Sequence, residues 1–276
     1  MPEKTILISV GHALQEPWTT IFRSGSEKTW LTSEIPKEFE LVHFHGLPLK
    51  TFGAFWDRIH EHLRWKNRWV ARPLAWMDTL IGFAFSSYIP ATRVSNKFHS
   101  TYPVFEVCFP DSYQFGRWKV LAILKYFLEQ TQYDYIYIIT NNSYLNFSNL
   151  KSLVTDLPQT KFYGGTKAYE GAEFAAGNNC LISRDVAHLI VKNRRNFSLG
   201  LIADSAMGKL LKSLNVDFFP LPSLIVDRPE SLVQISDPEL KKHFHFRVKS
   251  GPITARKDVQ IMNSLHQRLA NLEEPS

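Results

Sequence analysis

The sequence contains few cysteines and no long apolar run. Only Cys108 and Cys180 occur among its 276 residues, and each lies in a short apolar segment. We therefore expect buried thiols, and neither a disulfide framework nor a cysteine-based metal site. The first apolar run, Thr5–Val10, is too short to span a bilayer, and no signal-peptide pattern precedes it. These absences predict a cytoplasmic protein without a transmembrane segment.

Glycine-rich phosphate-binding motifs and long basic runs are also missing. Gly164-Gly165 is not part of a G-x-G-x-x-G pattern, which excludes the usual dinucleotide fingerprint. The net charge of +6 suits an anionic ligand, but the 32 Lys and Arg residues are scattered and form no nucleic-acid-binding module. We expect no nucleic-acid partner. A phosphorylated small molecule remains open, and so does a basic face that only contacts solvent.

The composition is that of a folded domain, with 44 % hydrophobic and 13 % aromatic residues. Predicted strands cover residues 5–10, 40–44, 102–109, 133–139, 162–165, 179–183 and 216–219. Predicted helices cover residues 49–70, 113–130, 147–157, 184–192, 203–214 and 252–274, with Ser148 and Ser183 as expected caps. Residues 226–238 are predicted to be loop-rich. This alternation predicts one α/β domain over residues 1–276, with a mixed, mostly parallel central sheet flanked by helices.

A polar segment follows the most apolar predicted strand. Tyr133–Ile139 is rich in β-branched and aromatic residues, as in a central strand buried on both faces. Thr140-Asn141-Asn142 comes directly after it. Ligands of open α/β sheets bind at the carboxyl ends of such strands. The sequence predicts a ligand site here, with a plain polar strand end as the alternative.

Three pieces of sequence carry motifs in a fixed order. Asp111–Lys119 begins Asp-Ser-Tyr and ends in Lys; Thr140–Leu150 follows the predicted central strand; Gly177–Ser183 precedes Ala203–Gly208. Together they resemble the β-1,3-galactosyltransferase/Fringe family. That family has Asp-Ser-Tyr, Asp-Asp-Asp-Val-Phe-Val-Asn, Gly-Gly-Tyr-Val-Leu-Ser and Glu-Asp-Val-x-x-Gly elements in the same order. A weaker similarity to its Arg-x-Thr-Trp element involves Arg23 and Trp30.

The resemblance implies a GT-A-type fold and an inverting transfer of a sugar from a nucleotide sugar, usually a UDP-sugar, to a hydroxyl of a glycan or glycoconjugate. The nucleotide-sugar half would cover about residues 1–145, and the acceptor and catalytic half about 146–276. The donor-binding residues it suggests are Arg23, Trp30, Tyr113, Lys119, Thr140, Asn141 and Asn142. The acceptor-binding residues it suggests are Glu173, Phe174 and Gly177.

The chain departs from the family at the acidic triplet, which holds a divalent cation on the donor diphosphate. Thr140, Asn141 and Asn142 stand there instead, and Mn²⁺ and Mg²⁺ prefer carboxylate oxygens. The enzyme is then metal-independent, or holds Mn²⁺ or Mg²⁺ weakly, or has lost catalysis. Arg23, Lys119, N–H groups at a helix N-terminus, or a cation held mainly by the phosphates would offset the diphosphate charge.

A late histidine pair provides other candidate ligands. Alternation along Lys242–Lys249 places His243 and His245 on one face of a predicted strand. With Asn142 they form the predicted metal set, since neutral imidazole binds Mn²⁺. Phosphate contact from this segment, including Arg247 and Lys249, and a plain surface strand are the alternatives.

Asp204 is the predicted general base. An inverting transfer needs a carboxylate that removes the proton of the acceptor hydroxyl, and Asp204 lies at the Asp of the Glu-Asp-Val element. An Asp at a helix start is also often a simple cap. Asp78 is a second candidate base, or a surface loop residue. A non-catalytic nucleotide- or glycan-binding protein of the same fold is the alternative function.

Overall fold

The computed structural model describes residues 4–14, 16–47, 87–96, 100–111, 116–197, 201–251 and 255–273. The predicted helix over residues 49–70 lies outside the described residues, as do the predicted site residues Asp78 and Tyr113. Among the residues that are described, no helix is both long and apolar enough to cross a lipid bilayer.

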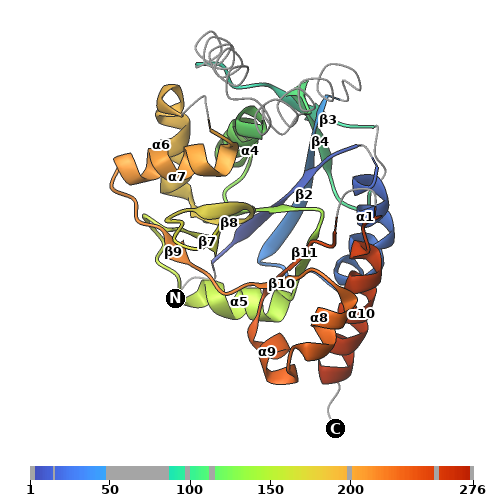
Figure 1. Ribbon diagram of the computed structural model, residues 1–276. Helices are drawn as coiled ribbons and strands as arrows, with labels where there is room; N and C mark the ends of the chain where they lie inside the picture. Colours follow the sequence, from blue (N-terminus) through green and yellow to red (C-terminus); the bar gives the residue numbers. More distant parts are fainter. Residues whose placement is uncertain are drawn as a thin grey trace, which may run out of the picture.

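An eight-stranded mixed sheet forms the centre of the described part of the chain, in the order β3-β4-β2-β1-β5-β8-β7-β9 (Figure 1). Its strands are β1 (Ile6–His12), β2 (Phe39–Leu47), β3 (Thr92–Val94), β4 (Val104–Pro110), β5 (Tyr135–Thr140), β7 (Tyr163–Lys167), β8 (Ala175–Ser183) and β9 (Phe219–Pro220). Strands β4, β2, β1 and β5 run parallel, whereas β8 is antiparallel to both β5 and β7. The predicted mixed α/β fold with a central sheet flanked by helices is confirmed.

Alternation along the central strands produces two hydrophobic cores. On β5, Tyr135, Tyr137 and Ile139 belong to one core, and Ile136 and Ile138 belong to the other. Helices α4 (Gly116–Gln130), α6 (Arg184–Lys192) and α7 (Ala203–Ser213) cover one face of the sheet; α1 (Trp18–Ser24), α5 (Phe147–Asp156) and α10 (Asp258–Glu273) cover the other (Figure 1). The central strands are therefore buried on both sides, as their apolar runs predict.

A second sheet has three strands in the order β10-β11-β6. It pairs β10 and β11, from the C-terminal part of the chain, with β6, which directly follows β5. Its strands are β6 (Ser143–Leu145), β10 (Leu224–Val226) and β11 (His245–Val248). Strand β11 pairs antiparallel with β6, so that Arg247 lies opposite Ser143. The Val248 N–H also donates to the Asn142 carbonyl over 2.9 Å. The small sheet thus holds β11 beside the polar segment that follows β5.

Several predicted boundaries are wrong for local reasons. The region 226–238 contains two short helices, α8 (Pro229–Gln234) and α9 (Asp237–Lys242). Each has a proline in its first turn, where backbone N–H groups make no hydrogen bond within the helix, so proline is tolerated. The cap of α5 is Asn146 rather than Ser148, because the Asn146 side chain accepts the N–H of Asn149. Strand β9 is Phe219–Pro220 and shares only Phe219 with the predicted strand 216–219, and α10 begins at Asp258 instead of residue 252.

Arg117 is a buried cation in the first turn of α4. Arg117 is 2 % exposed, and none of its guanidinium nitrogens has a hydrogen-bond partner among the described residues. The guanidinium lies 4.7 Å from the ring centroid of Trp118 and 5.5 Å from that of Phe197, and burial lowers the pKa of Arg117 to about 10. Ring contacts recover only part of the cost of desolvating a charge.

Arg117→Met is therefore expected to raise the free energy of unfolding by about 1–4 kcal/mol, measured by urea denaturation. Arg184→Met is the matched control. The Arg184 guanidinium also lies over a ring, that of Phe127, but donates to the carbonyls of Tyr133, Leu128 and Thr131. Its loss is expected to lower stability by about 1.5–3 kcal/mol. A loss of similar size for Arg117→Met would contradict the prediction and indicate that Arg117 has an anionic partner.

Candidate functional site

Asp204 and Gly177 meet at the edge of the sheet where β5 ends. Because β8 is antiparallel to β5, with Ile139 opposite Asn179, the start of β8 lies level with the end of β5. The exposed Gly177 donates its N–H to Asp204 Oδ2 over 3.3 Å. Asp204 Oδ1 accepts the N–H of Ser205 over 2.7 Å in the first turn of α7. Main-chain donors thus fix the half-buried carboxylate at the carboxyl ends of the parallel strands, where open α/β sheets bind ligands.

Asp204 is not the N-cap of α7, because Ile202 occupies that position. Its carboxylate still accepts a hydrogen bond from the first turn, so a stabilising role at the helix start and a chemical role are compatible. The Oδ2 atom is the one directed at exposed Gly177. Gly177 has no side chain, and a Cβ added there would lie 3.7 Å from this oxygen.

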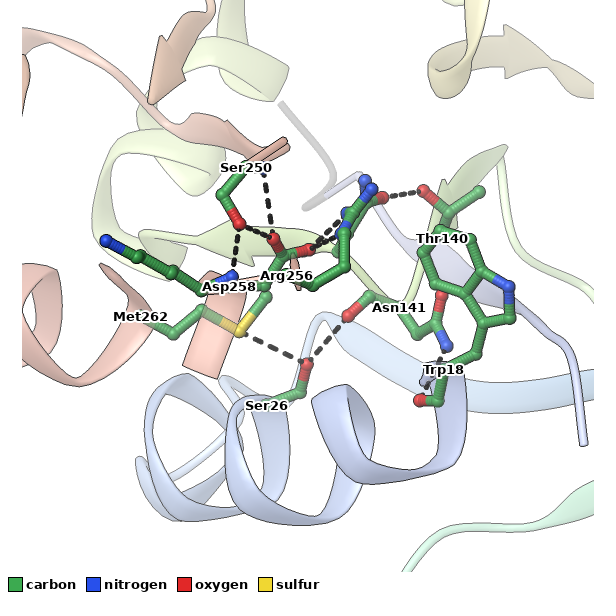
Figure 2. Close-up of polar contacts among 10 residues, drawn as sticks. Trp18, Ser26, Thr140, Asn141, Ser250, Arg256, Asp258 and Met262 are labelled. Carbon is green, nitrogen blue, oxygen red and sulfur yellow. Dashed lines mark hydrogen bonds and ion pairs between the residues drawn. The ribbon is translucent and has the colours of Figure 1, made fainter. Parts of the chain in front are cut away.

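Thr140, Asn141 and Asn142 connect the end of β5 to α1 and β11. Figure 2 shows Thr140 and Asn141 beside Trp18 and Ser26. The Asn141 side chain donates to the Trp18 carbonyl over 3.0 Å, and its own carbonyl accepts from Ser26 Oγ over 3.2 Å. Asn142 Oδ1 accepts from Thr140 Oγ1 over 2.5 Å. Both asparagines are buried, at 4 % and 7 % exposure. These neutral side chains hold segments of the chain together at the end of β5.

The predicted metal residues do not form a metal site. His245 is fully buried; its two ring nitrogens lie 2.8 Å from Ser223 Oγ and 3.1 Å from Ser143 Oγ. Burial, helped by the charge of Arg247, lowers the pKa of His245 to about 3, so it is neutral near pH 7. In the described part of the chain, no group of three or more His, Cys, Asp or Glu residues is placed to hold an ion.

His243 does not share a strand face with His245, and that prediction is wrong. Helix α9 ends at Lys242 and β11 begins only at His245, so His243 lies between them as the C-cap of α9. Its Nδ1 lies 2.8 Å from the Glu239 carbonyl and its Nε2 lies 3.7 Å from Glu239 Oε1. Asn142 Oδ1 is bound to Thr140 and both histidines have contacts of their own, so these three described residues do not fit a divalent cation.

The remaining predicted donor residues have different surroundings. Trp30 is 1 % exposed, and its ring centroid lies 5.8 Å from that of Phe147. Trp30 is therefore a core residue and does not present a surface to a sugar or a base. Arg23 is exposed in the last turn of α1. Lys119 Nζ lies 2.5 Å from Asp111 Oδ1, which links the two ends of the Asp-Ser-Tyr segment to each other.

The predicted acceptor residues Glu173, Phe174 and Gly177 do not all lie beside Asp204. Glu173 is exposed and ion-paired with Lys212 near the end of α7, and the hydrogen bond from Lys212 lowers the pKa of Glu173. Lys212 follows Asp204 by two helical turns, or about 12 Å. Phe174 packs on Gly208, where an added Cβ would lie 2.2 Å from Phe174 Cβ. Only Gly177 of the three directly contacts Asp204.

Three basic residues gather beside Asn141 and Asn142, and Arg256 among them was missed by the sequence analysis. The Arg256 guanidinium lies 4.9 Å from the ring centroid of Trp18 and forms an ion pair with buried Asp258 (Figure 2). The charge of Arg247, with burial and the charge of Arg256, lowers the pKa of Lys249. Alternation along β11 indicates the position of Arg247 and Lys249, but nothing local indicates that Arg256 stacks on Trp18.

Two cavities lined by described residues lie elsewhere. One of about 420 Å³ lies between α4 and β3 and is lined by Arg93, Phe105 and Tyr126 among others. The other, of about 410 Å³, is lined by Thr5, Glu40 and Tyr133 among others. Neither includes the end of β5 or Asp204. We base the candidate site on the carboxyl edge of the sheet, because the fixed carboxylate and the basic residues lie there.

No protein-family model and no curated protein matches the chain. Among solved structures, it is similar to a glycosyltransferase involved in the glycosylation of the major capsid of PBCV-1, with 9 % identity over 95 % of this chain and 98 % of that one and a TM-score of 0.41. It is also similar to a mannosyltransferase from Pyrobaculum calidifontis in complex with GDP-Man and Mn²⁺, with 12 % identity and a TM-score of 0.44. That match covers 98 % of this chain but only 65 % of the mannosyltransferase. The resemblance to the β-1,3-galactosyltransferase/Fringe family stays a prediction.

Proposed function

We propose that this chain transfers a sugar from a nucleotide sugar, with UDP-sugar as the donor, to a hydroxyl of a glycan or glycoconjugate. The observation that supports this most is the Asp204 carboxylate, held by the N–H of Gly177 at the end of β5. A carboxylate held by main-chain donors at the carboxyl ends of the strands, where open α/β sheets bind ligands, supports a role for Asp204 as general base.

In the proposed reaction, Asp204 Oδ2 removes the proton of the acceptor hydroxyl. The hydroxyl oxygen attacks the anomeric carbon from the face opposite the nucleotide, and the bond between that carbon and the phosphate oxygen breaks. The electron pair leaves with the nucleoside diphosphate, and the anomeric configuration inverts. Asp204 acts by orienting the hydroxyl as well as by taking its proton. No step uses a divalent cation, because the residues at the end of β5 do not fit one.

Calorimetric titration with UDP, GDP and CMP, each with EDTA and with Mn²⁺, tests the donor class. We expect UDP to bind, since the predicted donor is a UDP-sugar. Binding of GDP or CMP alone would keep a nucleotide-sugar enzyme but overturn the UDP donor. Absence of binding by all three under both conditions would contradict the proposed function.

A non-catalytic nucleotide- or glycan-binding protein is the second candidate. It is favoured by the neutral Thr140-Asn141-Asn142 segment, whose side chains hold the fold together. Incubation with UDP-sugars and candidate glycan acceptors separates the two functions. Nucleotide binding without transfer, and without slow release of UDP from the donor, would favour this second candidate.

A further inference from the structure

The end of β11 carries two basic residues next to Asn142, on the strand face opposite Phe246 and Val248. The N–H of Val248 donates to the Asn142 carbonyl over 2.9 Å, which fixes this strand end beside β5. Phe246 and Val248 are fully buried, and side chains alternate along a strand. Arg247 and Lys249 therefore lie on the opposite face, where burial decreases along the strand: His245 is fully buried, Arg247 is half-buried and Lys249 is exposed.

Arg256 reaches the same region from the other side. Its guanidinium lies over Trp18, whose carbonyl accepts the side-chain N–H of Asn141. Buried Asp258 holds Arg256 in an ion pair and accepts the N–H and Oγ of Ser250 over 3.0 and 2.5 Å (Figure 2). The segment that carries Lys249 is thereby tied to the segment that carries Arg256. We call Arg247, Lys249 and Arg256 the cationic cluster.

Among the described residues, the cluster brings three cationic groups together with one carboxylate, that of Asp258, which is paired with Arg256. The charges of Arg247 and Arg256 both lower the pKa of Lys249. Like charges placed together raise the energy of the ligand-free protein, and an anion with several negative charges removes that repulsion. A divalent cation is repelled by the same field. The cluster therefore attracts a diphosphate and opposes the ion that an acidic triplet would hold.

We propose that the cationic cluster binds the diphosphate of the nucleotide-sugar donor and replaces a divalent metal there. Exposed Lys249 and half-buried Arg247 would contact the diphosphate, and Arg256, whose side chain is 5 % exposed, would act through the charge that it adds beside Lys249. The inference rests on the proposed function and adds the chemistry of donor binding to it. It also explains why neutral Thr140, Asn141 and Asn142 are sufficient at the end of β5. The positive charge next to the diphosphate comes from the chain itself, so no carboxylate is needed to recruit a cation.

The test uses Lys249→Glu and calorimetry in EDTA with UDP, uridine and inorganic pyrophosphate. Lys249 is exposed, so the substitution is expected to leave the fold intact, which circular dichroism checks. We expect wild-type protein to bind UDP and pyrophosphate without metal. Lys249→Glu is expected to weaken both by about 10- to 100-fold and to leave uridine affinity unchanged. Lys241→Glu, exposed in α9, makes the same change of net charge and is expected to change little.

Other outcomes separate the inference from the proposed function. UDP binding that requires Mn²⁺, or that is unaffected in both Lys249→Glu and Arg247→Gln, would overturn the inference and leave the transferase proposal standing. A third outcome is that the wild-type protein binds pyrophosphate but none of UDP, GDP and CMP, and that Lys249→Glu abolishes pyrophosphate binding. This result would support the anion site but contradict the proposed function. Absence of both nucleotide and pyrophosphate binding would overturn both.

Discussion

Asp204→Asn is expected to reduce sugar transfer by about 100- to 10,000-fold, because it removes the proposed general base. The amide oxygen of Asn can still accept the N–H of Gly177 or of Ser205, so the local fold is expected to persist. Nucleotide affinity is expected to stay within a few-fold of wild type, since a base acts on the acceptor and not on the donor. Product formation at saturating donor, followed by chromatography, is the measurement.

Asp217→Asn is the control for this substitution. Asp217 is exposed beyond the end of α7, and the change removes the same charge from the same part of the chain. Its activity is expected to match wild type. Unchanged turnover in Asp204→Asn would remove Asp204 from the reaction and leave it as a residue that stabilises the start of α7. Loss of activity together with loss of nucleotide binding would point to a structural defect instead.

Asp258→Ala is expected to lower the free energy of unfolding by about 3–5 kcal/mol. Asp258 is completely buried and is hydrogen-bonded to Ser250 and ion-paired with Arg256, whose side chain is only 5 % exposed. Removing the carboxylate leaves the guanidinium desolvated and without its counter-charge, which is the costly way to break a buried pair. Urea denaturation of the wild-type and variant chains measures the difference.

Asp237→Ala provides the matched comparison, because it also removes an Asp from an Arg–Asp pair. Asp237 is 52 % exposed, and its partner Arg268 keeps hydrogen bonds to the carbonyls of Leu232 and Ile235. Its loss is expected to change stability by less than about 1 kcal/mol. Equal effects of the two substitutions would show that burial of the Asp258–Arg256 pair does not determine its contribution.

The strands and their burial could be predicted from sequence because they depend on local pattern. The apolar run of β5 indicates burial on both faces, and the polar residues after it lie at the strand end where open α/β sheets bind ligands. Asp204 and Gly177 could also be selected from their motifs, and the structure places them in contact. What the motifs do not determine is whether Asp204 takes a proton, and that remains for the variant to decide.

The rest of the site depends on contacts between distant segments. An aromatic residue such as Trp30 suits a sugar or a core equally well, and only packing against Phe147 shows which. The position of His243 depended on where α9 ends. Arg256 is placed near the end of β5 by its contact with Trp18, which is more than 200 residues earlier in the chain, and by its ion pair with Asp258. Residue type and spacing alone carry no information about such contacts.

The pairing of β6 with β11 has a consequence for synthesis on the ribosome. All eight strands of the central sheet precede β11 in the chain, so the sheet and the Asp204 carboxylate can form while the cationic cluster is still inside or near the exit tunnel. A nascent chain at that stage has its proposed base but lacks Arg247, Lys249 and Arg256. We expect a growing chain to become able to bind nucleotide late, and affinity for nucleotide to report whether the segment beyond β10 has docked.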